Sequence, residues 1–294
     1  MSILFYIKLM KINELTPDRT EYLKILQNIA KPPKRLWCVG ELPTKRLPTV
    51  AIIGSRKPTT YGREVAHNIA AKLAKHGIVI VSGLALGIDG IAHKAALEAG
   101  GITLAVMAGG LDSVHPRSHR EIALNIVTRG GALISEYPPG AQPFPSNFIE
   151  RNRLVSGISD AVLVVEASAK SGTIHTANFA LEQGREVLAI PGNITSAASE
   201  GCNNLIKSGA APVTSATDVL HALGLTPANT QTELPLGDTP HEQTLLQLLH
   251  SGLRDGDELQ KQSGLAPALF GQTLTMLEIS GRVRALGANQ WSLN

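Results

Sequence analysis

The sequence predicts an α/β fold in which a doubly wound, mostly parallel sheet is followed by a small winged-helix domain. Three observations support this expectation. Six near-continuous apolar runs follow one another between residues 49 and 192, as expected for strands covered on both faces. Segments with helical periodicity separate these runs, which indicates successive βαβ units. Residues 241–294 then show a different pattern, with three helical segments before two short strands.

The connecting segments have the spacing of crossover helices. Val65, Ile69 and Leu73 recur four residues apart before a glycine, and Ile122 and Ile126 repeat the pattern. Ligands of such sheets bind outside the carboxyl ends of the strands, so the turns after the apolar runs are where function is expected. The predicted strands lie within residues 49–54, 78–83, 102–109, 132–137, 160–167 and 186–192.

The chain divides into four predicted segments. Residues 1–48 contain a helix around 22–29 and a basic stretch with prolines, which we expect to pack on the sheet edge as a reduced helical extension. The sheet occupies residues 49–224. Residues 225–240 are rich in proline and glycine and poor in apolar side chains, which is typical of a linker. Residues 241–294 form the predicted winged helix.

The predicted winged helix is slightly acidic. It carries four Lys or Arg against five Asp or Glu, a formal charge of −1, and its third helix, within 266–281, has no cation. A helix that reads duplex DNA normally carries cations to meet phosphates. We therefore expect this domain to contact protein rather than duplex DNA.

Composition excludes several classes of protein. With 43% apolar and 17% charged residues the chain is an ordinary globular protein, and a net charge of +3 permits an anionic partner without requiring one. Cys38 and Cys202 stand in no metal-binding or disulfide spacing, so we expect no metal, no cofactor and a reduced, cytoplasmic location. The apolar start of the sequence is too short for a membrane span and is broken by Lys8.

The first predicted strand ends in the turn GSRKPTTYG, residues 54–62. A dinucleotide-binding turn would place further glycines where Ser55, Arg56 and Lys57 stand, because a buried pyrophosphate must approach the backbone. Bulky cations there suit an extended chain of phosphates instead. Arg56 can meet phosphate oxygens with its forked donors, or it can brace the turn by pairing with a carboxylate.

The second and third strands also end in turns rich in small residues, SGLALGIDGIAH (82–93) and AGGLDSVHP (108–116). Glycine at such turns lets the backbone approach a ligand. We expect Asp89 to be a helix N-cap and His93 to be a packed helix residue. Three such turns on neighbouring strands indicate a shared binding rim.

Two later segments add cations to this rim. In FIERNRLVSGISD, residues 148–160, Arg151 and Arg153 flank Asn152 near Phe148, which suits single-stranded nucleic acid because a base can stack on the ring. The alternative is a helix start whose arginines form surface ion pairs.

The second segment is EASAKSGTIHTA, residues 166–177, which brings Lys170, Ser171, Gly172 and Thr173 to the start of a helix, a natural site for phosphate. Ser171 has no His or Asp partner of the hydrolase type, and we expect no catalytic residue here.

Taken together, these motifs resemble the DprA (Smf) family of bacterial DNA-processing proteins. The matching stretches include GSRKPTTYG, SGLALGIDGIAH, GGLDSVHP, ERNRLVSGISDAVLVVEA, KSGTIHTA and LEQGREVLAIPG, in this order, within residues 37–215. The resemblance implies a Rossmann-like domain that binds single-stranded DNA, forms a homodimer and loads the RecA recombinase onto incoming DNA during natural transformation. It also implies a recombination mediator rather than an enzyme.

The same resemblance assigns roles to individual residues. Cationic side chains would grip phosphates, Phe148 would stack on a base, and backbone groups of small residues would line the strand. The residues implied are Gly54, Ser55, Arg56, Phe148, Arg151, Asn152, Arg153, Lys170, Ser171, Gly172 and Thr173.

Two other functions stay open at this point. The same turns could hold a nucleoside monophosphate, as in Rossmann-like phosphoribohydrolases, with Glu166 as the nearby carboxylate, although the catalytic loop of those enzymes is not matched here. A regulator that reads duplex DNA through residues 241–294 is the third possibility, against which the acidic balance of that segment argues.

Overall fold

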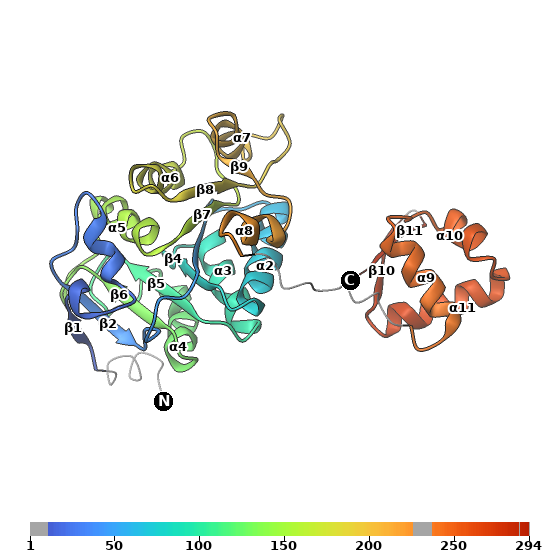
Figure 1. The fold of residues 1–294 in the computed structure, drawn as a ribbon, viewed down its shortest axis with the longest axis horizontal. Helices are drawn as coiled ribbons and strands as arrows, with labels where there is room; N and C mark the ends of the chain where they lie inside the picture. Colours follow the sequence, from blue (N-terminus) through green and yellow to red (C-terminus); the bar gives the residue numbers. More distant parts are fainter. Residues whose placement is uncertain (1–10, 226–236, 288, 294) are drawn as a thin grey trace. The chain divides into compact units, whose positions relative to one another are not determined.

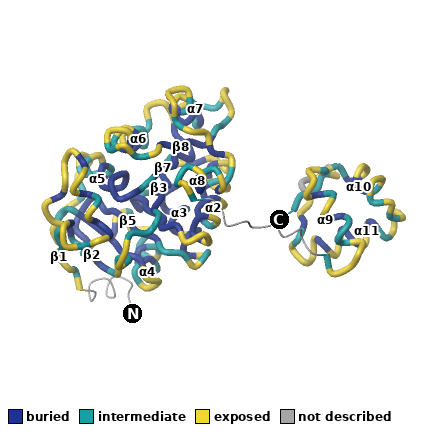
Figure 2. The backbone as a smooth tube through the Cα atoms, viewed as in Figure 1, coloured by how far each residue is buried: buried dark blue, intermediate teal, exposed yellow. Residues whose placement is uncertain are grey.

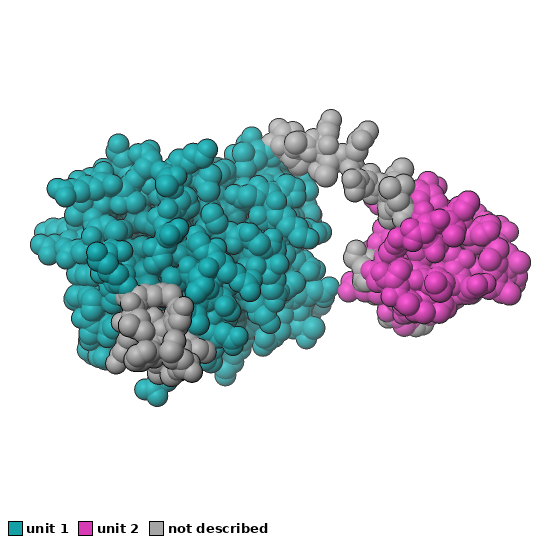
Figure 3. Space-filling view, turned by 90° about the horizontal axis from the view of Figure 1, so that it is seen from below, with its two compact units in different colours: residues 1–225 teal, residues 226–294 magenta. Residues whose placement is uncertain are grey.

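A computed structural model describes residues 11–225, 237–287 and 289–293. The chain forms two compact units, residues 1–225 and residues 226–294 (Figure 3), and each is described by itself. Most of the expected linker, 225–240, lies outside the described residues.

The first unit is built around one sheet (Figure 1), which has nine strands in the part of the chain that is described. All six predicted strands are present and pair in parallel, and the predicted fold class is confirmed. The strands, in their order across the sheet, are β1 (Asn13–Leu15), β2 (Leu36–Gly40), β6 (Ala132–Ser135), β5 (Thr103–Met107), β4 (Val79–Ser82), β3 (Thr49–Ile53), β7 (Ala161–Val164), β8 (Glu186–Ala189) and β9 (Ala211–Pro212).

The amino-terminal segment differs from the prediction in two ways. The expected helix around residues 22–29 is a short 3-10 helix, Lys24–Asn28, because Pro32 and Pro33 follow closely and prevent a longer helix. The basic stretch after it contributes strand β2, which pairs antiparallel with β6 and is itself paired with β1. The segment packs on the sheet edge as expected and covers the otherwise unpaired edge of β6.

Helices cover both faces of the sheet, so the central strands β3 to β7 are buried along their length (Figure 2). Ile52 and Val50 of β3 face one helix layer and Ala51 and Ile53 face the other, as the two-residue period of a strand requires. One layer contains α2 (Thr60–Lys75), α3 (Ile88–Glu98), α4 (Arg120–Thr128) and α8 (Ala216–Ala222). The other contains α5 (Pro145–Ile158), α6 (Thr173–Glu182) and α7 (Glu200–Lys207).

The order of the strands creates a topological switch point. From β3 the chain adds β4, β5 and β6 on one side, then returns through α5 to place β7 on the other side of β3. The connections after β3 and after β7 therefore diverge at their carboxyl ends, and a crevice opens between them, as in other open α/β sheets.

The second unit has the predicted winged-helix pattern. Three helices pack around a small core that includes Leu246, Leu259 and Leu277. The Asp255 side chain caps the second helix by accepting from two backbone N–H groups. The elements are α9 (Pro240–His250), α10 (Gly256–Ser263), α11 (Pro267–Ile279), β10 (Val283–Gly287) and β11 (Gln290–Leu293).

Candidate nucleic-acid interface

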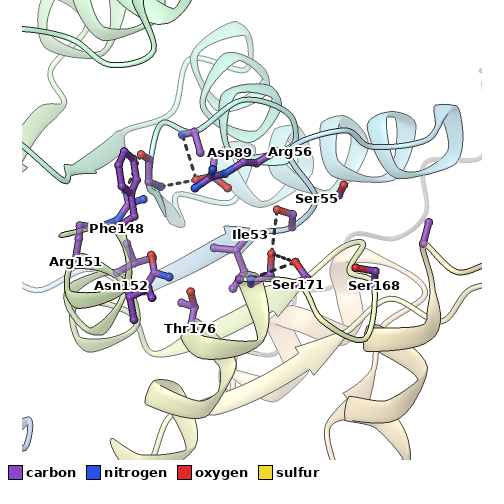
Figure 4. A pocket seen from close by; sticks show the side chains of 18 of the residues that line it. Ile53, Ser55, Arg56, Asp89, Phe148, Arg151, Asn152, Ser168, Ser171 and Thr176 are labelled. Carbon is purple, nitrogen blue, oxygen red and sulfur yellow. Dashed lines mark hydrogen bonds between the residues drawn. The ribbon is translucent and has the colours of Figure 1, made fainter. Parts of the chain in front are cut away.

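A crevice of about 540 Å³ lies at the switch point, outside the carboxyl ends of β3, β4 and β7. Segments far apart in sequence line it: the turn after β3, the turn after β4, the first half of α5, and the loop between β7 and α6 (Figure 4). Its lining includes most of the expected site residues, namely Gly54, Ser55, Arg56, Phe148, Arg151, Asn152, Ser171, Gly172 and Thr173.

Arg56 stands at the crevice with an exposed side chain. Its guanidinium carbon lies 5.5 Å from the centre of the Phe148 ring, a cation–π contact. In the described residues Arg56 forms no ion pair, so the alternative of a turn braced by a carboxylate does not hold there. The charge is available to an anionic ligand.

Phe148 is the aromatic surface of the crevice. Its ring is partly buried between Arg56 and His115, whose ring lies 6.0 Å away in an edge-on arrangement. Asn152, one turn further along α5, also lines the crevice. A flat ring held beside a cation presents both an apolar face and a positive charge to the same ligand.

Arg151 lines the crevice but is not exposed. Only 4% of the residue is accessible, and its Nη1 donates to the backbone oxygens of Gly83 and Val106, at the carboxyl ends of β4 and β5. Burial lowers the pKa of the guanidinium, with the Asp89 carboxylate opposing the shift. The expectation that Arg151 is an exposed grip for phosphate is therefore corrected, because the residue is buried and its Nη1 holds two strand ends together.

Arg153 is directed elsewhere. Its Nη2 donates to both carboxylate oxygens of Glu136, at 2.7 and 2.6 Å, and the residue is 4% accessible. Arg153 is absent from the lining of the crevice. This position also corrects the sequence-based expectation for Arg153. Side chains two residues apart in a helix point to different sides, so the two arginines of the RNR motif do not share one surface.

The loop after β7 supplies hydroxyl groups. The Thr173 hydroxyl donates to the backbone oxygen of Gly54 at 3.1 Å, and the Ser171 hydroxyl donates to Thr173 at 3.0 Å. Lys170 is exposed but does not line the crevice. The structure therefore brings Ser171, Gly172 and Thr173 into the site and leaves Lys170 beside it.

Backbone donors are less available than expected. The N–H of Ser55 donates to the Glu166 carbonyl at 2.7 Å, and the N–H of Ser171 donates to the Ser168 carbonyl at 3.0 Å. These two residues therefore offer hydroxyl groups rather than backbone N–H groups to a ligand. Gly54 is required by packing, because a side chain there would come within 2.7 Å of Ile88.

Asp89 has a different role from the one predicted. Gly87 is the N-cap of α3, whereas the Asp89 carboxylate accepts from the N–H groups of Gly83 and Ala85 and fixes the turn after β4. The residue is 7% accessible, and burial raises the pKa of its carboxyl despite the nearby Arg151. The predicted N-cap is wrong, but the role is structural in both cases.

Among the lining residues that sequence reasoning missed, two carry hydroxyl groups. Thr176 is buried in α6, one turn after the helix begins, and faces the crevice, and Ser168 lies within the loop after β7 (Figure 4). The spacing of Thr173 and Thr176 in a helix puts them on one side, which is a signal that the sequence contains.

The described part of the chain contains neither a metal-binding cluster nor a membrane-spanning helix. No group of three or more His, Cys, Asp or Glu side chains is placed to hold a metal ion among those residues. None of the helices described there is both long and apolar enough to cross a bilayer.

Comparison with protein families gives two matches. The family model of DNA recombination-mediator protein A matches residues 13–224, and that of the DprA winged helix domain matches residues 210–289. Among curated relatives, protein Smf of Escherichia coli is 47% identical over 191 residues, covering 65% of this chain and 51% of that protein. DNA processing protein DprA of Bacillus subtilis is 38% identical over 213 residues, covering 72% and 71%.

Two solved structures are similar in fold. DNA processing protein A from Streptococcus pneumoniae superposes with a TM-score of 0.67 at 38% identity, covering 73% of this chain and 75% of that one. The protein from Helicobacter pylori, described for its single-stranded DNA binding mode, gives 0.65 at 32% identity, covering 74% and 97%. The chain spans 51% and 66% of the length of the first curated relatives it matches. By its family model and by these relatives, the chain belongs to the DprA/Smf family of DNA-processing proteins.

Proposed function

We propose that this chain binds single-stranded DNA in the crevice between β3 and β7. The observation that carries the proposal is the exposed Arg56 guanidinium over the Phe148 ring. A phosphate can meet the cation while an unstacked base meets the ring, the combination typical of single-strand binding. Bases inside a duplex do not expose their faces, so this arrangement favours a single strand.

The charges that line the crevice support an anionic ligand. Asp89 is the one carboxylate among the described lining residues, and it is buried and already accepts from two N–H groups. The accessible charge at the crevice is then that of Arg56. The Helicobacter pylori relative, whose structure concerns single-stranded DNA binding, supports the same ligand for this chain.

We further propose that this chain is a recombination mediator and not an enzyme. It would act in the cytoplasm as a homodimer, protect incoming DNA and load RecA during natural transformation. The family match to a recombination mediator supports this role. Glu166, the carboxylate expected of a phosphoribohydrolase-like site, is buried and hydrogen-bonded within the fold. Glu166 is 3% accessible, accepts from the N–H of Thr59 at 3.1 and 3.2 Å, and does not line the crevice.

The binding test is a titration of the full chain with fluorescent oligonucleotides of mixed sequence, read by anisotropy at two salt concentrations. We expect saturable binding that weakens steeply with salt, since phosphate contacts release counterions. Weak binding that does not change with salt, or a clear preference for duplex of the same sequence, would contradict the proposal.

The mediator test uses RecA. The substrate is single-stranded DNA already coated with a single-strand-binding protein. ATP hydrolysis by RecA on this DNA should rise when the wild-type chain is added and should not rise with the Arg56→Ala variant. To test the enzyme alternative, nucleoside monophosphates are incubated with the chain and free base is measured by chromatography. Base release that the Glu166→Gln variant loses would favour the hydrolase.

A further inference from the structure

A second hollow lies between α2 and α3, apart from the crevice. It has a volume of about 390 Å³ and is open to solvent along the two helices. We call it the α2–α3 groove. Its lining residues are Thr60, Arg63, Glu64, His67, Ile91 and Lys94.

The groove begins close in sequence to the crevice on its α2 wall. On the α2 wall, Arg56 lines the crevice and Thr60 lines the groove, only four residues later. On α3, Asp89 lines the crevice and Ile91 lines the groove, but residues two apart in a helix lie on opposite sides, so α2 is the wall that links the two hollows. A chain that passes Arg56 reaches Thr60, at the α2 end of the groove.

Exposed cations mark this route. Lys57 and Arg63 are exposed and form no ion pair in the part of the chain that is described. Lys94 is 67% exposed at its side chain and has only a loose pair with Glu98, at 3.7 Å. Such an exposed ion pair contributes little to stability, so a phosphate could replace Glu98 as the partner of Lys94. Glu64 is the carboxylate of the lining, and Glu98 beside the groove pairs with His67 and Lys94, so Arg63 is the lining cation that could meet a phosphate without first losing a partner.

We propose that the α2–α3 groove carries the sugar-phosphate backbone of the strand after it leaves the crevice. The proposal rests on single-strand binding in the crevice and adds the path that the strand follows over the protein beyond it. From Thr60 to His67 the groove follows α2 for about 10 Å, enough for about two or three phosphates. Arg63, in the middle of this wall, would contact one of them.

The experiment compares two matched variants of the full chain, Arg63→Gln and Lys72→Gln. Both remove one exposed positive charge from α2, but Lys72 lies in the last part of the helix, about 13 Å along its axis from Arg63. Each variant is titrated with oligonucleotides from about 4 to about 20 nucleotides, a range that brackets common single-strand site sizes. Thermal unfolding checks that both variants are folded.

The expected result depends on length. Arg63→Gln should bind the shortest oligonucleotides like the wild-type chain and lose about three- to tenfold in affinity for longer ones. The slope of log affinity against log salt should fall by about 0.7, one phosphate contact, for the long strands only. Lys72→Gln should behave like the wild type at every length.

The possible failures are distinct. If the wild type binds strands but the two variants behave alike at every length, the strand does not use the groove and this inference is overturned, while binding in the crevice stands. If the wild type binds no oligonucleotide with salt dependence, the proposed function fails as well. If Arg63→Gln changes RecA stimulation but no DNA affinity, the groove is a protein contact instead.

Discussion

Replacing Arg151 with alanine should destabilise the first unit strongly, even though the residue lines a candidate binding site. The substitution removes two hydrogen bonds from Nη1, to the backbone oxygens of Gly83 and Val106. It also leaves the buried Asp89 without its nearby cation. The turn after β4 and the end of β5 then lose the side chain that joins them to α5.

The size of the effect follows from burial. Hydrogen bonds that involve a charged group contribute about 1.5–3 kcal/mol each, and removing one partner from a buried charged pair costs about 3–5 kcal/mol. We expect a loss of about 3–5 kcal/mol in the free energy of unfolding. With a urea dependence of about 2 kcal/mol/M, the unfolding midpoint should fall by about 2 M.

The assay can isolate the first unit. The chain has two tryptophans, and Trp37 lies in β2 of the first unit whereas Trp291 lies in β11 of the second. In a Trp291→Phe background, tryptophan fluorescence in urea follows the first unit alone. Arg56→Ala is the matched control, because it removes an exposed arginine from the same crevice and should cost about 1 kcal/mol or less. A loss below 1 kcal/mol for Arg151→Ala would refute the structural role.

Three more outcomes are expected. Arg56→Ala should weaken single-strand binding about 10- to 100-fold, since a charged hydrogen bond to phosphate is worth about 1.5–3 kcal/mol; unchanged anisotropy titrations at moderate salt would contradict this. Arg153→Ala should lower the urea midpoint of the first unit by leaving Glu136 unpaired, yet DNA affinity of the folded protein should hold; an affinity loss with no midpoint change would reverse the assignment. Burial lowers the pKa of His93 to about 3, below its unfolded value near 6.5. As the pH is lowered, the unfolded chain therefore takes up the proton before the folded one does. The free energy of unfolding should fall by about 1.4 kcal/mol for each pH unit of acidification between these two values. His93→Gln should show a shallower fall between pH 6.5 and 5 in the same fluorescence assay, and an equal fall in both proteins would exclude His93 as its source.

The sheet could be predicted because its strands are local signals. Runs such as TVAII and AVLVV are apolar without interruption, and parallel strands buried on both faces require that pattern. Strand β2 was missed because LWCVG is short and lies in a basic stretch, and its pairing with β6 depends on an edge that only the folded sheet presents. The amino-terminal helix is shorter than its local periodicity indicates, and it has 3-10 geometry, which periodicity alone does not distinguish from an α-helix.

The location of the site could be predicted from the sequence better than the role of each residue in it. The turn at Arg56, the ring of Phe148 and the loop at Ser171 meet at the switch point because parallel strands bring their carboxyl ends to one edge. The roles of Arg151 and Arg153 could not be read from the sequence. Side chains two residues apart in a helix point in different directions, and the carbonyl groups and carboxylate that the two arginines meet come from other segments of the chain.

The crevice is assembled from segments that stretch from Ile53 to Ala198, and this spread has a consequence for folding. No part of the chain shorter than that interval contains all of its walls, so during synthesis the crevice forms only after β8 has emerged. A ligand held there must bind the native sheet as a whole and not a local fragment. Occupancy at 100 times the dissociation constant should therefore protect the whole first unit from unfolding by about 2.7 kcal/mol, so that amide exchange slows even at strands far from the ligand.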